Sequence, residues 1–256
     1  SICMTAVFLV MVLLTACQGL AEKKNVQSNE TTSSTLRLSN TDQQKYQETS
    51  GETVQGIERW WLKRNENHQT PEVSDYIDLS KYDAYYVNPK CKKKKIFLTF
   101  DCGYENGFTP KILDVLKKQK IVAAFFVTKP FIREGRELVR RMKKEGHIVG
   151  NHTVHHKSMP TLSDRDNKQE IIDCAEYCKE ATGYEMDHFI RPPMGEYNEK
   201  TLKLTKSMGY KTIFWSMAYV DFDVNKQPGK QYVVEHFKKY THNGAIHSQM
   251  RKHWMK

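Results

Sequence analysis

The first 16 residues of this 256-residue chain lack charge, and the residues behind them lack the apolar side chains of a folded core. Residues 1–16 contain no charged side chain, and the apolar run at residues 4–14 is shorter than the roughly 20 residues that span a bilayer. Residues 18–58 consist almost entirely of Glu, Lys, Asn, Gln, Ser and Thr. This composition excludes a spanning helix here and predicts a signal-peptide core followed by a disordered tether.

A cysteine lies at the junction of these two segments. Leu14-Thr15-Ala16-Cys17 resembles the processing box of bacterial lipoproteins, in which the cysteine becomes the lipidated first residue. We therefore expect a signal peptide at 1–16, with an incomplete start, and a lipidated Cys17 with its tether at 17–58. The chain would then be exported and anchored to the outer face of a bacterial cytoplasmic membrane. The alternative is a buried core helix, which the polar tract behind Cys17 argues against.

The sequence also lacks the motifs that would explain its net charge of +10 by nucleic-acid binding. It has no recognition-helix pattern, no zinc-finger spacing and no aromatic RNA-binding strand motif. For an exported protein, an anionic wall polymer or a membrane surface is the better partner. The six cysteines indicate no disulfide framework, since Cys174 and Cys178 lie one helical turn apart and the others are scattered. We expect a monomer.

Strand and helix patterns alternate over residues 96–246. Repeated β-then-α units predict an α/β fold with parallel strands and right-handed crossovers. Six strands fit either an open doubly wound sheet or a (β/α) barrel, and periodicity alone does not choose between them. We expect strands at 96–100, 121–127, 147–149, 189–190, 211–216 and from 245, and helices starting at 109–110 and covering 138–146, 163–182, 198–209 and 231–240.

The residues before this region, 59–95, are rich in aromatic side chains but have no periodic pattern. Trp60, Trp61, Tyr85 and Tyr86 are the most prominent. We expect this segment to be an extension that wraps around the main domain, 96–256, and packs its rings on it. A separate carbohydrate-binding module is the alternative.

Chemically active side chains follow three of the predicted strands. Asp101 and Cys102 end the first, His152 and His156 follow another, and Arg191 follows a third. Because sites in such folds form at the carboxyl ends of the strands, these residues predict one hydrolytic site. Imidazoles four residues apart face the same direction on a helical turn, and zinc commonly takes such nitrogen ligands.

Two short motifs make this pattern specific. Residues 99–103 read Thr-Phe-Asp-Cys-Gly, and residues 191–195 read Arg-Pro-Pro-Met-Gly. With the histidine pair, in this order and spacing, they resemble the polysaccharide deacetylases, carbohydrate esterase family four. Residues 99–107 look closest to the branch that deacetylates muramic acid and makes the spore-cortex δ-lactam. The resemblance covers residues 57–246. It implies a distorted (β/α) barrel that hydrolyses N-acetyl groups, linear amide C–N bonds, from peptidoglycan glycan strands, with N-acetylmuramic acid as the expected sugar.

The resemblance also implies roles for single residues. Asp101 would be the general base that takes a proton from the attacking water, and Arg191 would hold that carboxylate in place and keep it ionised. His152 and His156 would bind a divalent metal, expected to be zinc, that polarises the acetyl carbonyl and lowers the pKa of the water. Asp221 would tune the acid histidine. The expected substrate-binding residues are Tyr104, Pro193, Gly195 and Trp215.

Three departures from the family pattern bear on activity. Cys102 stands where most of the family has aspartate; a thiolate would complete a Cys-His-His zinc site, whereas a neutral thiol would leave weak metal binding. Phe222 replaces the usual tryptophan. The family's last motif, Leu-x-His on a strand, supplies the acid that protonates the leaving amine. Here His247 comes too early to match, and the basic, aperiodic ending indicates a truncated or frame-shifted terminus. We expect this chain to be crippled or inactive.

Two other functions stay open. One is a deacetylase that acts on N-acetylglucosamine in wall glycan or on chitooligosaccharides. The other is a non-catalytic lipoprotein that binds the cell wall and has kept the fold without the chemistry. Cys102 and the unusual ending favour this last function, whereas the intact Asp101, His152, His156 and Arg191 oppose it.

Overall fold

The computed structural model describes residues 56–74, 77–91, 94–219 and 228–251. The expected signal peptide, the lipidation site at Cys17, the tether up to residue 55, and Asp221 with Phe222 lie outside the described residues. No helix in the described part of the chain is both long enough and apolar enough to cross a membrane.

The centre of the described part is a seven-stranded sheet in which every neighbouring pair is parallel. Parallel pairing follows from the β-then-α order of the sequence, because each strand is reached by a crossover. The strands, in spatial order, are β11 (Ala245–Arg251), β5 (Ile96–Cys102), β6 (Ala124–Val127), β7 (Ile148–Asn151), β8 (Phe189–Ile190), β10 (Lys211–Ile213) and β4 (Ala84–Tyr85).

Contacts between the two ends of the sheet close it into a barrel. The segment after β10 meets β11: the Ser216 N–H donates to the Ile246 carbonyl at 3.0 Å, and the Ser248 N–H donates to the Met217 carbonyl at 2.9 Å. The segment after β4 also meets β11, since the Asn88 N–H donates to the Gly244 carbonyl at 2.9 Å. This closure decides between the open sheet and the barrel. The prediction of a distorted (β/α) barrel is confirmed.

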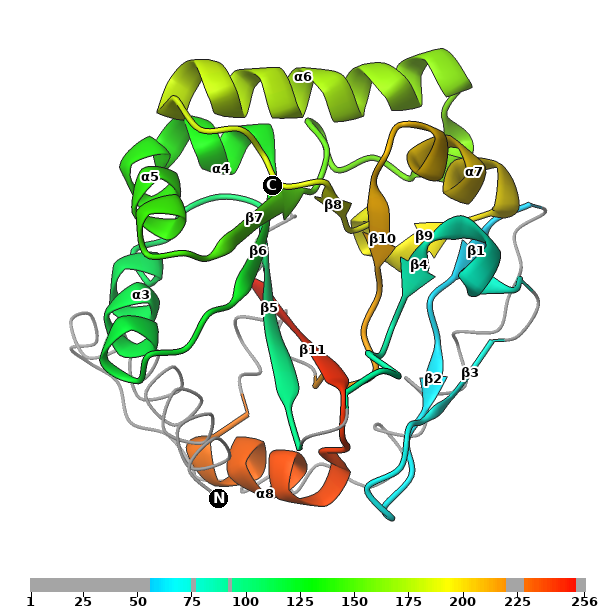
Figure 1. The fold of residues 1–256 in the computed structure, drawn as a ribbon, viewed down its shortest axis with the longest axis vertical. Coiled ribbons are helices and arrows are strands. Elements are labelled where there is room, and N and C mark those ends of the chain that lie inside the picture. The colour runs from blue at the N-terminus through cyan, green and yellow to red at the C-terminus, as the bar shows by residue number, and fades with distance from the viewer. Residues whose placement is uncertain (1–55, 75–76, 92–93, 220–227, 252–256) are drawn as a thin grey trace, which may run out of the picture.

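The helices cover the outside of this sheet (Figure 1). Ser163 caps the longest of them, and the capping box of Asn198 and Thr201 starts α7, both where the sequence predicts a start. The helix expected at 138–146 is preceded by a separate short one, because Gly135 interrupts the run. The helices are α3 (Thr109–Lys118), α4 (Lys129–Glu134), α5 (Arg136–Lys144), α6 (Asp164–Thr182), α7 (Glu199–Ser207) and α8 (Lys230–Tyr240).

Two expected strands are shorter than predicted. The strand expected at 121–127 begins only at Ala124, and the one expected at 211–216 ends at Ile213. In the second case Phe214 still donates to the Tyr85 carbonyl of β4, and from Ser216 onward the chain pairs with β11 instead. The apolar pattern cannot show this change of partner, because both partners bury the same side chains.

The aromatic extension is part of the barrel's own core. Trp60 stacks on Phe214 with ring centroids 4.4 Å apart, and its indole N–H donates to the Trp215 carbonyl at 2.8 Å. β4 of the same segment forms one edge of the main sheet. Smaller elements complete the region: β1 (Glu58–Arg59) pairs with β9 (Glu196–Tyr197), β2 (Leu62–Lys63) pairs with β3 (Glu72–Val73), and a 3₁₀ turn spans Leu79–Tyr82.

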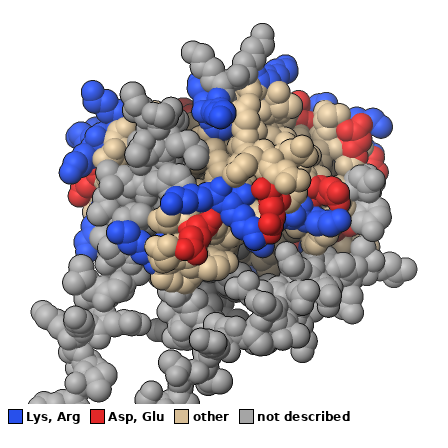
Figure 2. Space-filling model, turned by 90° about the horizontal axis from the view of Figure 1, so that it is seen from below, with Lys and Arg blue, Asp and Glu red and all other residues tan. Residues whose placement is uncertain are grey.

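Acidic and basic side chains are interspersed on the face seen from below in Figure 2, rather than sorted into a basic stripe. Exposed pairs of opposite charge, such as Lys63 with Glu72 and Lys200 with Asp164, occur among the described residues. Such pairs contribute little stability each. They show that part of the positive charge is locally balanced.

The strand β11 buries a histidine on its outer face. His247 is fully buried, packs against Phe237 of α8 with ring centroids 4.5 Å apart, and has no hydrogen-bond partner for either ring nitrogen among the described residues. Burial lowers its pKa well below the ordinary value, with nearby His236 and Arg191 adding to the effect. The folded chain therefore holds this imidazole neutral and unsatisfied, which is destabilising.

Replacing His247 by Leu is expected to stabilise the fold. At pH 7.5 the gain is about 1–3 kcal/mol, because an unsatisfied buried polar group is removed. The folded-state pKa lies below the unfolded one, so the unfolded chain binds an extra proton below about pH 6.5 and stability is lost toward acid. His247→Leu removes up to about 1.4 kcal/mol of that loss per pH unit. Urea unfolding at pH 7.5 and 5.5 measures both effects, with exposed His188→Leu as control. A less stable His247→Leu chain contradicts the account.

Candidate active site

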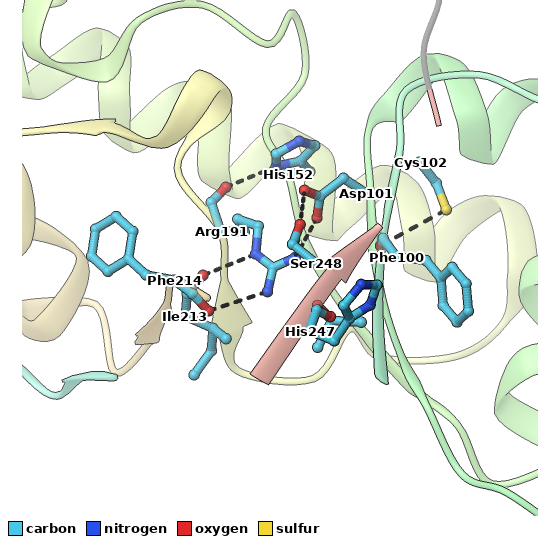
Figure 3. A network of polar contacts seen from close by, with 10 residues as sticks. Phe100, Asp101, Cys102, His152, Arg191, Ile213, Phe214, His247 and Ser248 are labelled. Carbon is cyan, nitrogen blue, oxygen red and sulfur yellow. Dashed lines mark hydrogen bonds and ion pairs between the residues drawn. The ribbon is translucent and has the colours of Figure 1, made fainter. Parts of the chain in front are cut away.

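The site is organised by one arginine with no exposed surface. Arg191 follows β8, and its guanidinium donates to Asp101 Oδ1 at 2.7 Å and to Ser248 Oγ at 3.2 Å. Its other nitrogens donate to the Ile213 carbonyl at 3.0 Å and the Phe214 carbonyl at 3.3 Å. Its planar fork thus joins the ends of four strands, β5, β8, β10 and β11 (Figure 3).

Aromatic rings and one carboxylate compensate the buried charge of Arg191. The guanidinium carbon lies 4.4 Å from the Phe126 ring centroid and 5.5 Å from that of Trp215. Burial lowers the pKa of Arg191, and the charge of Asp101 opposes that shift. The guanidinium stays protonated, because arginine keeps its proton even when it is buried. Arg191 therefore presents a fixed positive charge to Asp101.

Asp101 lies near the end of β5 with its side chain 9% exposed. Oδ1 accepts from Arg191, and Oδ2 accepts from the Ser248 hydroxyl at 3.2 Å. The carboxylate is thus held through both oxygens, one from β8 and one from β11. A carboxylate has about four lone-pair sites, so lone pairs remain for a further proton donor.

His152 is joined to the same arginine through its backbone. The carbonyl of Arg191 accepts from His152 Nδ1 at 2.8 Å, so Nδ1 carries a proton. Burial lowers the pKa of His152 to about 4, with the Arg191 charge contributing. The imidazole is therefore neutral near pH 7, and the lone pair of Nε2 is left for a ligand. Arg191 connects the carboxylate on one side with this imidazole on the other.

His156 meets His152 by a different route from the one predicted. The two residues lie in an irregular loop after β7, not on a helical turn, and left-handed backbone at Thr153 (φ 68°) and His156 (φ 54°) folds the loop back. Their ring centroids are 4.7 Å apart at 73°. The histidines do lie together, but the helical reason for it was wrong. Glu170 holds the loop, since it accepts from the backbone N–H groups of Val154 and His155.

Cys102 does not take part in the site, contrary to one of the two expectations. Neighbouring residues of a strand point to opposite faces, so Cys102 faces away from Asp101. Its thiol donates weakly to the Phe100 carbonyl at 3.9 Å, and it belongs to the core beside Leu113 and Phe131 (Figure 3). The expectation that Cys102 completes a zinc site is wrong. Within the described ranges, no three His, Cys, Asp or Glu side chains form a metal cluster.

The Pro-Pro-Met-Gly segment supports the site from one side. Pro193 and Gly195 are buried in the 3₁₀ turn Pro193–Gly195, whereas Met194 is 52% exposed with a left-handed backbone. Gly195 has φ +67°, and a Cβ there would lie 2.9 Å from the Trp215 ring and 3.1 Å from Trp60. Gly195 thus serves close packing of Trp215, which in turn lies against Arg191.

Tyr104 lies in the loop after β5, partly exposed, and burial raises the pKa of its phenol. Nearby, the Glu105 carboxylate accepts from the Gly107 N–H at 2.6 Å and from the Thr109 N–H at 3.3 Å. These bonds fix the loop between β5 and α3, which carries Tyr104. The role of Tyr104 in substrate binding stays a prediction.

Sequence reasoning did not identify Ser248 as a site residue. It did predict that His247 does not take the role of the acid histidine. Ser248 gave no signal, because it lies in a stretch without recognisable pattern. His247, one residue earlier, faces the opposite side of β11 and packs under α8, so its ring does not reach Asp101. The structure thus agrees with the expectation that His247 does not match the family's acid histidine.

Fold and site together define the class of protein. Residues 88–213 match the family described as Polysaccharide deacetylase. The chain is 44% identical over 190 residues to the peptidoglycan-N-acetylmuramic acid deacetylase PdaA of Bacillus subtilis (strain 168), and the match covers 73% of this chain and 72% of that protein. This chain belongs to the polysaccharide deacetylase family.

Two solved structures and one further relative agree with this assignment. The structure of Bacillus subtilis PdaA, a family 4 carbohydrate esterase, matches with a TM-score of 0.72 at 43% identity, over 76% of this chain and 83% of that one. A peptidoglycan-N-acetylglucosamine deacetylase of Bacillus cereus is 35% identical over 139 residues, 54% of this chain and 50% of that protein. A CE4 family pseudoenzyme from Bacillus anthracis has a TM-score of 0.59 at 25% identity, over 65% of this chain and 58% of that one.

Replacing Arg191 by Met is expected to destabilise the fold by about 3–5 kcal/mol, because the Asp101 charge is left buried without its partner. Urea unfolding at pH 7 measures the loss. Arg59→Met is the matched control: Arg59 also pairs with a carboxylate, Glu196, but its side chain is 53% exposed. Its loss should be within about 1 kcal/mol. Equal losses for the two variants contradict the role given to Arg191.

Proposed function

We propose that this chain is a peptidoglycan deacetylase that hydrolyses the N-acetyl group of N-acetylmuramic acid. The observation that carries the proposal is the Asp101–Arg191–His152 arrangement, in a chain 44% identical to a relative named for that reaction. Removing an acetyl group from an amide needs a base for water, charge stabilisation at the carbonyl and a proton for the leaving amine. Asp101 supplies the first of these, and a metal held by the histidine pair would supply the second.

Asp101 is the base in this proposal. Arg191 occupies Oδ1 and Ser248 occupies one position on Oδ2, so the carboxylate cannot rotate freely. Its remaining lone pairs accept a proton from a water molecule next to the acetyl carbon. The bond from Arg191 orients the carboxylate, while Tyr104 and Trp215 are proposed to contact the sugar.

The histidine pair fits a divalent metal, for which we propose zinc. His152 offers Nε2, because its Nδ1 is committed to the Arg191 carbonyl, and the His156 ring lies against it. A hydrogen bond from the other ring nitrogen to a backbone carbonyl commonly orients metal-binding imidazoles in proteins. When bound, the metal polarises the acetyl carbonyl and lowers the pKa of water. Cys102 is not a ligand, so the protein supplies two ligands from this loop.

Protonation of the leaving amine is the weak step. The only histidine of β11 among the described residues, His247, packs beneath α8 on the face opposite Ser248. General acid catalysis contributes about 10²–10⁴-fold, so we propose that this chain deacetylates slowly. Asp221, which the family resemblance links to the acid histidine, lies outside the described residues.

The location of the chain is part of the same proposal. The apolar run at 4–14 followed by Leu14-Thr15-Ala16-Cys17 supports export and lipid attachment at Cys17. Anchoring of a monomer at the membrane's outer face gives the domain access to glycan strands. Labelled palmitate that is incorporated into the parent chain but also into a Cys17→Ser variant would contradict this.

Replacing Asp101 by Asn is expected to abolish acetate release, with a loss of at least about 10²-fold, because an amide does not accept the proton of water. The assay uses glycan strands freed of stem peptides, with added zinc, and measures acetate and new amino groups. Asp173→Asn, a partly exposed aspartate of α6, is the control and should keep parent activity. Unchanged turnover in Asp101→Asn means that the base is misassigned.

The same assay distinguishes the functions that stay open. Amino groups on muramic residues support the proposal, whereas amino groups on glucosamine residues alone support the activity for which the Bacillus cereus relative is named. Glycan binding without acetate release at any zinc concentration supports a non-catalytic wall protein. The likeness to a family pseudoenzyme makes this last function a specific alternative.

Replacing Met250 by His is expected to raise the rate. Residue 250 pairs with Asp101 in the register of β11 and β5, and it is two residues from Ser248 along the strand. We expect a histidine introduced there to protonate the amine, with a gain of about 10²-fold or more in acetate release. Gln249→His, on the face opposite Ser248, is the control. Equal rates for both variants contradict the proposed missing acid.

A further inference from the structure

Ser248 forms a closed hydrogen-bond triangle with the ion pair. Its hydroxyl accepts from Arg191 at 3.2 Å and donates to Asp101 Oδ2 at 3.2 Å, while Arg191 donates to Asp101 Oδ1 at 2.7 Å. The guanidinium has no acceptor, so the serine proton cannot point to Arg191. It therefore points to the carboxylate. Figure 3 shows the hydroxyl between the two charged groups.

The backbone of β11 holds this hydroxyl in place from both sides. The Ser248 N–H donates to the Met217 carbonyl at 2.9 Å, and the preceding carbonyl, of His247, accepts from the Thr99 hydroxyl at 2.7 Å. Ser248 is 1% exposed, so water does not compete for its bonds. A buried hydroxyl fixed in this way keeps one rotamer, and it passes this constraint on to the carboxylate.

We propose that Ser248 is a positioning residue, which fixes the carboxylate plane of Asp101. The inference rests on the proposed function of Asp101 and extends it. Arg191 holds Oδ1 and the Ser248 hydroxyl holds Oδ2, so the carboxylate keeps one orientation toward the water. Loss of the hydroxyl frees one of its two oxygens. Ser248 keeps its own proton throughout the reaction.

The test compares Ser248→Ala with two other variants. Ser216→Ala is the matched control, because it removes a buried hydroxyl that bonds to β11 at the Ile246 N–H and has no bond to Asp101. Ser248→Thr keeps the hydroxyl on a residue suited to a strand. For each chain, kcat and KM for acetate release from freed glycan strands are measured across pH, and the carboxyl carbon of Asp101 is followed by NMR during an acid titration.

In Ser248→Ala, the acidic limb of the kcat/KM profile is expected to move to higher pH, because one donor to the carboxylate is lost. The NMR titration of Asp101 should move in the same direction, and KM should stay near its parent value. Ser248→Thr and Ser216→Ala should both follow the parent profile.

Superimposable profiles and titrations for Ser248→Ala and the parent chain overturn the inference. So does complete loss of activity in a folded Ser248→Ala chain, since that assigns the hydroxyl to the reaction itself. If no variant releases acetate but the NMR titration still shifts only in Ser248→Ala, the deacetylase proposal fails while the positioning role stands.

Discussion

The buried ion pair between Arg191 and Asp101 is the interaction on which the rest of the site depends. Both groups lie out of water, where a single charge is costly and a compensated pair is tolerated. The guanidinium donates four hydrogen bonds: one nitrogen bonds to Asp101 and Ser248, and the other two bond to carbonyls at the end of β10. Its own carbonyl orients His152. One residue therefore sets the relative position of the base and of the imidazole.

Such a pair is weak evidence for stability, because its attraction is offset by the desolvation of two charges. Its value here is geometric. The carboxylate comes from β5 and the hydroxyl from its neighbour β11, whereas the guanidinium comes from β8, three strands away in the sheet. The guanidinium reaches the other two groups only when the barrel closes. The three groups therefore come together only in a barrel that is closed by the Ser216 and Met217 contacts. Trp60 from the extension stacks on Phe214 beside this junction, which explains why the aromatic segment belongs to the barrel.

Much of this arrangement was predictable from the sequence, and the failures have physical reasons. Asp101, His152 and Arg191 follow strands, and parallel strands end at one edge, so their convergence follows from the pattern. The sequence predicts that the strand ends at residue 100, but β5 continues to Cys102. Because side chains alternate along a strand, this continuation turns Cys102 to the face opposite Asp101. The approach of His156 depends on left-handed backbone at Thr153, which no propensity indicates for threonine. Ser248 acts through a contact 147 positions away in the chain.

The strand β11 contributes Ser248 to the site but no imidazole. Its alternation turns Ser248 inward to the ion pair and His247 outward to Phe237, so the strand supplies a hydroxyl to the base and buries its imidazole elsewhere. The same strand closes the barrel, and its sequence therefore affects fold and chemistry together. The proteins to which this chain is similar include both peptidoglycan deacetylases and a pseudoenzyme.

The most direct test of a single site organised by Arg191 is a crystal structure of the chain soaked in zinc, with anomalous data at the zinc edge. The account predicts one strong peak about 2.0–2.1 Å from Nε2 of His152, shared with the His156 ring and facing the Asp101 carboxylate. A peak on the far side of the histidine loop from Asp101, or a zinc ion bound by Cys102, would contradict it.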